Sequence, residues 1–127
     1  MKLLVLFIFT LQSILFFAQS DINTIVKNDL IVGNIDQLSK HFTDNIDISI
    51  EDADAIYSRS QAAMILKKFF TDNKVIEFKT EHSSNSDDNN QYIISKMETE
   101  KGQFRVTYFI TKDNNSLKIK QFNIESY

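Results

Sequence analysis

The spacing of apolar residues changes near residue 74, and this change limits what the chain can fold into. Between residues 21 and 70 three segments carry apolar side chains at helical spacing, whereas from residue 74 onward apolar and polar side chains alternate. One earlier segment, residues 45–51, also alternates, with its isoleucines on a single parity. The sequence therefore predicts an α+β domain in which helices precede most of the strands.

The predicted helices have clear start and stop signals. The first covers residues 21–32 and ends at Gly33, a residue that adopts the left-handed conformation without a Cβ penalty. A second short helix follows at residues 34–42. The third covers residues 58–70 and opens on Ser-Arg-Ser-Gln, a capping-box pattern.

The predicted strands of the second half form an antiparallel meander. They cover residues 74–82, 92–99, 104–110 and 117–124, with a polar hairpin loop at 83–90. In the first of these strands Ile76, Phe78 and His82 share one parity, which we expect to face the helices. In the last strand the apolar parity changes between Ile119 and Phe122, which predicts a bulge or a sharp bend that curls the sheet. With the strand at 45–51 and a short one at 55–57, the order is α-α-β-β-α-β-β-β-β, three helices against a curved antiparallel sheet.

The first twenty residues have the pattern of a secretory signal peptide. Lys2 supplies a positive charge, an apolar run follows, and Ala18-Gln19-Ser20 places small residues where signal peptidase needs them. Cleavage after Ala18 and cleavage after Ser20 both fit. An uncleaved membrane anchor is the alternative, but the apolar run is shorter than the roughly 20 residues of a membrane span. We therefore expect an exported protein, periplasmic or secreted, with a single mature domain at residues 21–127 and no membrane contact after cleavage.

Several residues spread over the mature chain carry a resemblance to a known family. They are Gly33-Asn34, Leu38-Ser39 with Phe42, Tyr57-Ser58 with Gln61-Ala62, Phe69-Phe70, Phe78 with His82, Tyr92, and Thr99 through Gly102 to Phe104-Arg105-Val106. In these residues the chain resembles domain of unknown function 4783, a family of small exported bacterial proteins, within the nuclear transport factor 2-like superfamily. The resemblance implies a cone formed by a curved sheet and helices. It implies no activity, because the superfamily contains both enzymes and non-enzymes.

Candidate catalytic groups are few. A ketosteroid-isomerase-like site needs a carboxylate on the cavity side of the sheet, and most strand carboxylates have the opposite parity. If the protein is an enzyme, a small isomerase, dehydratase or hydrolase, its catalytic groups are His82, Tyr92 and Glu98. The two histidines lie far apart in the chain and there is no cysteine, so we expect no metal site. We also expect no cofactor.

The function that these observations favour is non-enzymatic binding of a small ligand or a protein partner. The binding surface is expected in the cone or on the open face of the sheet, with Phe78, His82, Tyr92 and Arg105 as candidate ligand contacts. A homodimer through the exposed sheet is a further expectation, since such a face otherwise leaves apolar area in water. The formal net charge of −3 is unlike the basic surface of a nucleic-acid-binding protein, so no nucleic-acid partner is expected.

Overall fold

The structure, a computed structural model, describes residues 21–87 and 89–127, and the predicted signal peptide (residues 1–20) lies outside them. The elements follow the predicted order. The helices are α1 (Ile22–Val32), α2 (Ile35–Ser39) and α3 (Arg59–Asp72), and the strands are β1 (Phe42–Ile50), β2 (Ala53–Ser58), β3 (Val75–Asp87), β4 (Asn90–Thr99), β5 (Gly102–Asp113) and β6 (Ser116–Ser126). In the described part of the chain, no helix is long and apolar enough to cross a membrane.

The helix ends form as the sequence predicts. Gly33 has φ of 82° and follows the last residue of α1 in the left-handed conformation. The capping box of α3 is complete, because the Ser58 side chain accepts from Gln61 N and the Gln61 side chain accepts from Ser58 N. The second helix is shorter than predicted. It ends at Ser39, and Phe42 is the first residue of β1.

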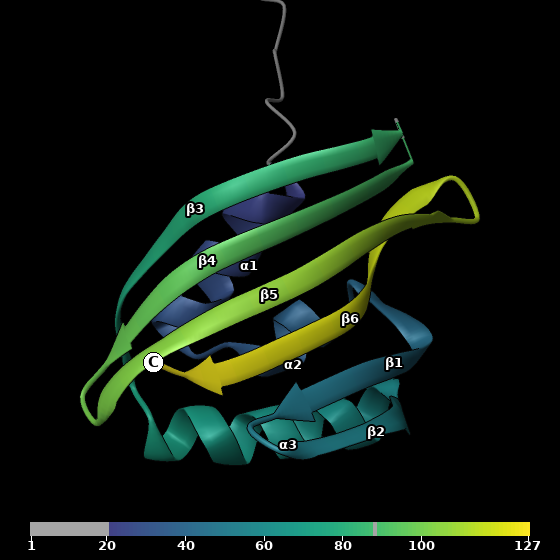
Figure 1. The fold of residues 1–127 in the computed structure, drawn as a ribbon. Coiled ribbons are helices and arrows are strands. Elements are labelled where there is room, and N and C mark those ends of the chain that lie inside the picture. The colour runs from purple at the N-terminus through teal and green to yellow at the C-terminus, as the bar shows by residue number, and fades with distance from the viewer. Residues whose placement is uncertain (1–20, 88) are drawn as a thin grey trace, which may run out of the picture.

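The six strands form one sheet in the order β2-β1-β6-β5-β4-β3 (Figure 1). The prediction of an antiparallel sheet is wrong for one pair, since β1 and β6 run parallel. After α3 the chain enters the sheet at its far edge, and the four-strand meander brings β6 back beside β1 in the same direction. The sheet is therefore mixed.

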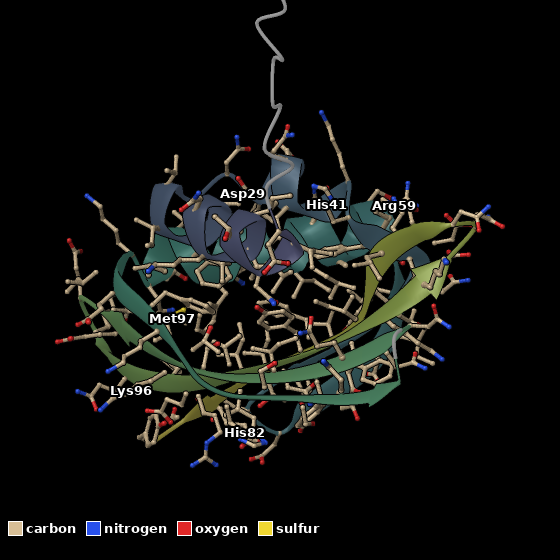
Figure 2. The ribbon with its side chains drawn as sticks, turned by 90° about the horizontal axis from the view of Figure 1, so that it is seen from above. Asp29, His41, Arg59, His82, Lys96 and Met97 are labelled. Carbon is tan, nitrogen blue, oxygen red and sulfur yellow. The ribbon has the colours of Figure 1, made fainter. Side chains whose placement is uncertain are left out.

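The sheet curves around the helices, and the space between them is filled by buried side chains (Figure 2). The largest of these are aromatic rings of the strands, namely Phe42 of β1, Phe78 of β3, Tyr108 of β5 and Phe122 of β6, and Met97 of β4 is also fully buried. The Tyr108 hydroxyl donates to Asn23 Oδ1 of α1 over 2.9 Å. Burial raises the pKa of Tyr108, so this group stays a neutral donor. The inside of the cone is the hydrophobic core of the domain.

Strand β3 departs from its predicted pattern because it contains bulges. Register shifts fall between Val75 and Glu77 and between Thr80 and His82, each adding a residue that breaks the alternation. Ile76 is consequently 58% exposed rather than buried, and His82 lies opposite Ile94 on the side away from the helices. The predicted loop at residues 83–90 is also wrong, because β3 continues to Asp87 and β4 begins at Asn90.

The predicted bulge in the last strand is confirmed. Ile119 pairs with Ile110, whereas Gln121 pairs with Phe109, so that Lys120 is the additional residue. Ile119 and Phe122 can then both point into the core although their parities differ.

Candidate functional site

The outer face of the sheet, which points away from the helices, carries the candidate site. On β4 the alternation is clear in Figure 2, where Met97 points toward the helices and Lys96 points away from them. The outer face extends over the whole sheet, and its central side chains are Asp47 and Ser49 of β1, Gln121 and Asn123 of β6, Thr107 and Phe109 of β5, and Tyr92 and Ile94 of β4.

A groove of about 440 Å³ lies on this face across β2, β1, β6 and β5. Its lining residues are Asn45, Asp47, Ile56, Phe109, Lys120 and Gln121, and we call it the Phe109 groove. Phe109 and Ile56 supply apolar surface, and Ile56 is 72% exposed. The other four side chains are polar. This combination of apolar walls and a few polar groups is typical of small-molecule sites.

The strand register explains why these side chains meet. Asp47 pairs with Ile56 across β1 and β2, and with Gln121 across β1 and β6. Gln121 in turn pairs with Phe109. Ile56, Asp47, Gln121 and Phe109 are thus consecutive cross-strand neighbours in one row, and such neighbours have Cβ atoms about 5 Å apart.

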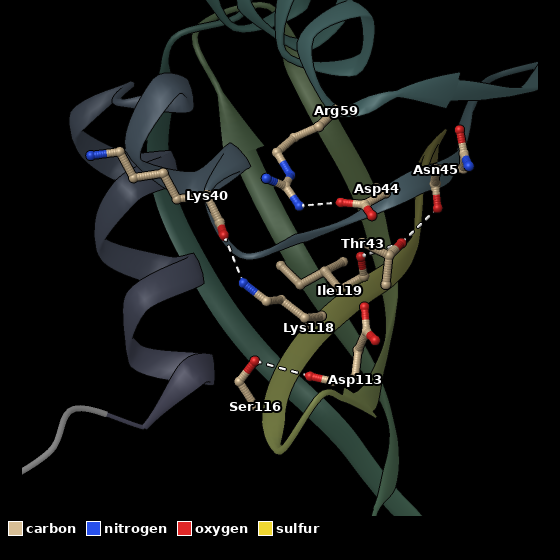
Figure 3. Close-up of polar contacts among 9 residues, drawn as sticks. All are labelled: Lys40, Thr43, Asp44, Asn45, Arg59, Asp113, Ser116, Lys118 and Ile119. Atoms are coloured by element: carbon tan, nitrogen blue, oxygen red, sulfur yellow. Dashed lines mark hydrogen bonds and ion pairs between the residues drawn. The ribbon is translucent and has the colours of Figure 1, made fainter.

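Contacts at the start of β1 hold this end of the sheet in place (Figure 3). Arg59, the first residue of α3, forms an ion pair of 2.8 Å with Asp44. The Thr43 hydroxyl donates to the carbonyl oxygen of Asn45 over 2.6 Å. On the neighbouring strand Lys118 Nζ donates to the carbonyl oxygen of Lys40 over 3.1 Å, which joins β6 to the segment before β1. These contacts hold the start of β1, which carries the groove residue Asn45, against both α3 and β6.

Two carboxyl groups lie close together at the groove. Asp54 of β2 is the diagonal cross-strand neighbour of Asp47, since Asp54 pairs with Ser49. A hydrogen bond shared with the Asp54 carboxyl raises the pKa of Asp47, and burial and the Asp54 charge act in the same direction. Lys120 of β6 is the cation in the groove lining, while Arg59 of α3 is engaged by Asp44.

We expect Asp47→Asn to stabilise the domain at neutral pH and not in acid. A raised pKa means that the folded state binds the proton more tightly, so stability falls as pH rises from the ordinary aspartate pKa through the raised one. The asparagine side chain does not ionise, so the variant keeps its stability as the pH rises. Its Tm should exceed that of the parent by about 2–4 °C at about pH 7.5, the shift given by roughly half a kcal/mol, and by nothing at about pH 3.

Thermal unfolding followed by circular dichroism at the two pH values measures this difference. Glu100→Gln, in the exposed turn after β4, is the matched control and should show no comparable gain. An Asp47→Asn variant that is equally or less stable than the parent at neutral pH would mean that the two carboxyl groups do not repel each other.

A second hollow on the outer face is charged rather than apolar. It measures about 280 Å³ and is lined by Glu77, Lys79, Glu81, Lys96, Glu98 and Gln103. Next to it the ring of Tyr127 lies 5.6 Å from Lys96 Nζ and 5.2 Å from Arg105 Cζ. These are cation–π contacts of exposed groups, each of which contributes about 0.5–1 kcal/mol. Without an apolar wall this hollow is a weaker candidate for a ligand than the Phe109 groove.

The residues predicted from the sequence divide between the two sides of the sheet. Phe78 is 2% exposed and belongs to the core. His82, Tyr92, Glu98 and Arg105 point outward with the rest of the outer face. Tyr92 pairs with Phe109 and is the predicted residue nearest to the groove.

The three predicted catalytic groups do not form one cluster. Glu98 is six residues from Tyr92 on β4, which corresponds to about 20 Å along a strand. His82 pairs with Ile94, four residues and roughly 13 Å from Glu98. Among the described residues, no ion pair or hydrogen bond of the His82 side chain is formed.

The sequence reasoning missed Phe109, Ile56 and the proximity of the Asp47 and Asp54 carboxyl groups. Phe109 left a signal, because it is apolar but has the opposite parity to Phe104, Val106, Tyr108 and Ile110. An apolar side chain on the outer parity of an amphipathic strand is a candidate for binding.

Two further titratable groups have shifted pKa values, but they lie on the helical side of the molecule (Figure 2). Burial raises the pKa of Asp29 in α1, and burial lowers the pKa of His41, which lies just before β1. Among the residues that the structure describes, no three His, Asp or Glu side chains are close enough to hold a metal ion.

The fold places the chain in the nuclear transport factor 2-like class. It is similar to a designed nuclear transport factor 2 protein with a long sheet, at 16% identity and a TM-score of 0.65 over 81% of this chain and 95% of that chain. A polyketide cyclase from Sinorhizobium meliloti, named as putative, is 15% identical, with a TM-score of 0.64 over 84% of this chain and 95% of that chain. At these identities the likeness concerns the fold alone.

The chain belongs to the DUF4783 family, a domain of unknown function whose model matches residues 23–125. A crystal structure of a DUF4783 protein from Bacteroides uniformis is 27% identical, with a TM-score of 0.76 over 80% of this chain and 94% of that chain. No curated protein matches the chain in sequence. The resemblance inferred from the sequence is thus confirmed for the family, and the fold is the one shared by nuclear transport factor 2-like proteins.

Proposed function

We propose that this protein is an exported, non-enzymatic binding module that holds a small ligand in the Phe109 groove. The observation that carries the proposal is the contrast between the two faces of the sheet. The inner face is packed against the helices by buried side chains, whereas the outer face has a groove of about 440 Å³. Export is supported by the pattern of the first twenty residues, in which a short apolar run precedes small residues.

The alternative, a small isomerase, dehydratase or hydrolase that uses a pocket histidine, has less support. A general base must reach its substrate within hydrogen-bond distance, and it works best with partner groups that orient it. His82 is exposed on the outer face, and Glu98 lies roughly 13 Å farther along the sheet. The predicted carboxylate, Glu98, is therefore not beside His82, although Tyr92 is a diagonal neighbour of this histidine.

A thermal-shift screen of a small-molecule library tests the proposal. A ligand that binds only the folded state raises Tm, because at a hundredfold excess over its Kd it adds about 2.7 kcal/mol to the free energy of unfolding. We expect the compounds that stabilise the parent protein to stabilise His82→Ala equally and to lose their effect on Phe109→Ala. His82→Ala is the matched control, since it removes a ring from the same face outside the groove.

The outcomes of this screen separate the candidate occupants of the outer face. Compounds that stabilise Phe109→Ala as well as the parent would place the ligand elsewhere and refute the proposal. Sedimentation velocity on the same proteins tests for the homodimer. A parent that sediments as a dimer, with a monomeric Phe109→Ala, would assign the face to a second copy of the chain rather than to a small ligand.

A further inference from the structure

Two hydrogen-bond acceptors in or beside the Phe109 groove have no donor among the described residues. Asp47 Oδ1 is buried from solvent and accepts no hydrogen bond from the described residues. Asn123 Oδ1 is also buried and accepts no hydrogen bond from the described residues. Asn123 lies on the same face as Asp47 and is its diagonal neighbour across the β1–β6 pair. Buried acceptors without donors reduce stability, and a ligand N–H group at the Asp47 carboxyl, which lines the groove, would add a donor there.

The charges around the groove leave a negative excess at this end. Asp47 and its neighbour Asp54 supply two carboxyl groups, while Lys120 is the cation in the lining. Among the described residues, neither carboxyl group forms an ion pair within 4 Å, and Arg59 of α3 is held by Asp44. A cationic ligand group is therefore complementary to the groove, and its hydrogen bonds to a carboxylate would be charge-assisted.

The walls determine what the rest of the ligand must be. Phe109 is half-buried in the sheet, and the Ile56 side chain on the other side of the groove is largely exposed. Both lose water contact if an apolar group fills the space between them. The face of an aromatic ring also attracts a nearby cation.

We propose that the Phe109 groove binds an organic amine, whose ammonium group donates to Asp47 and whose apolar part packs between Phe109 and Ile56. This inference rests on the proposed function, since it names the chemical class of the small ligand. A carboxylate ligand of the same shape fits less well. Such a ligand meets two carboxyl groups, and among the described lining residues Lys120 alone is a cation that offsets them.

Three probes of one shape separate the charge of the ligand from its apolar part. Benzylamine carries the cation, benzyl alcohol is neutral and benzoate is an anion. Their dissociation constants are measured by ¹H–¹⁵N NMR titration of the purified protein at neutral pH, with the backbone amides of Phe109 and Gln121 as reporters of the groove. We expect benzylamine to bind about tenfold more tightly than benzyl alcohol, and benzoate to bind most weakly.

Variants at the groove assign the preference to its residues. Asp47→Asn should weaken the binding of benzylamine about tenfold and leave the binding of benzyl alcohol unchanged. The asparagine side chain has the same shape as aspartate, so the variant tests the charge alone. Lys120→Gln should raise the affinity for benzylamine a few-fold, because it removes a positive charge that repels the ammonium group. Phe109→Ala should weaken all three probes. Glu98→Gln, a carboxylate of the other hollow, is the control and should change none of them.

The results distinguish a wrong ligand class from a wrong site. If benzyl alcohol or benzoate binds in the groove as tightly as benzylamine, or if Asp47→Asn keeps the preference for the amine, the inference is overturned while the proposed function stands. If none of the probes shifts the groove resonances, the inference is overturned, and the thermal-shift screen with Phe109→Ala decides the proposed function.

An alkylammonium group also occurs on the lysine side chains of proteins. Nα-acetyl-lysine amide, titrated in parallel, separates the two sources. Binding tighter than that of benzylamine would identify a lysine-containing peptide as the source of the amine, and weaker binding would identify a free aryl or alkyl amine. Both results support an amine site.

Discussion

Replacing Phe78 by alanine is expected to lower the free energy of unfolding by about 3–5 kcal/mol, the usual cost of removing a buried phenylalanine ring. The side chain is 2% exposed and pairs with Met97, which is fully buried. Many other core side chains hold the sheet and the helices in place, so these elements move little into the space that the ring leaves. The loss therefore includes a cavity term as well as the lost burial.

Urea denaturation of the parent and the variant measures this change. Ile76→Ala is the matched control, because Ile76 lies two residues away on β3 and is 58% exposed. We expect the control to change the free energy of unfolding by no more than about 0.5 kcal/mol. Equal losses in the two variants would mean that the strand alternates as the unbroken sequence pattern predicts. A Phe78→Ala variant of unchanged stability would mean that the ring lines a cavity rather than the core.

The contrast between Phe78 and Ile76 shows where the sequence pattern fails. Two residues of equal parity normally share a face, but the bulge between Val75 and Glu77 separates them. The bulge in β6 was predictable because apolar residues lie on both sides of it, so that Ile119 and Phe122 show the change of parity. After Phe78, β3 is polar on both faces. The bulge between Thr80 and His82 therefore leaves no signal in the sequence, whereas the bulge between Val75 and Glu77 lies between two buried apolar residues of different parity, Val75 and Phe78.

Local signals in the helices were reliable for a different reason. Gly33 and the Ser58 capping box act through contacts within a few residues, so their effect does not depend on the rest of the fold. The parallel pairing of β1 with β6 joins segments more than seventy residues apart, and no local pattern specifies it. The candidate site depends on that pairing, since it places Asp47 beside Gln121 and thereby completes the Phe109 groove. Sequence reasoning could therefore predict the strands that carry the site but not the side chains that line it.

The second large effect concerns Ser95, in the middle of β4. Its side chain is completely buried, and among the described residues its hydroxyl has no hydrogen-bond partner. The residues that pair with it are Thr80 of β3 and Val106 of β5. An unsatisfied buried hydroxyl costs about 1–3 kcal/mol. Ser95→Ala removes the hydroxyl and leaves a methyl group that packs in the same space.

We expect Ser95→Ala to raise the free energy of unfolding by about 1–2 kcal/mol, which in a domain of this size raises Tm by roughly 4–16 °C. Thr99 of the same strand is the opposite case, because its buried hydroxyl forms hydrogen bonds. It is also buried, but its hydroxyl donates to the carbonyl oxygen of Gly102 over 2.9 Å and accepts from Lys101 N over 3.2 Å. Thr99→Val, which keeps the shape and removes these bonds, should lower the free energy of unfolding by about 1 kcal/mol.

Urea denaturation of the two variants side by side tests the sign as well as the size of each change. Both variants delete one hydroxyl from a buried position on the inner side of β4, so a general effect of hydroxyl removal would move them in the same direction. Opposite signs would show that the hydrogen-bond partners decide the outcome. A destabilised Ser95→Ala would contradict the prediction and would mean that this hydroxyl is bonded in solution, for which a buried water is the simplest partner because it requires little space.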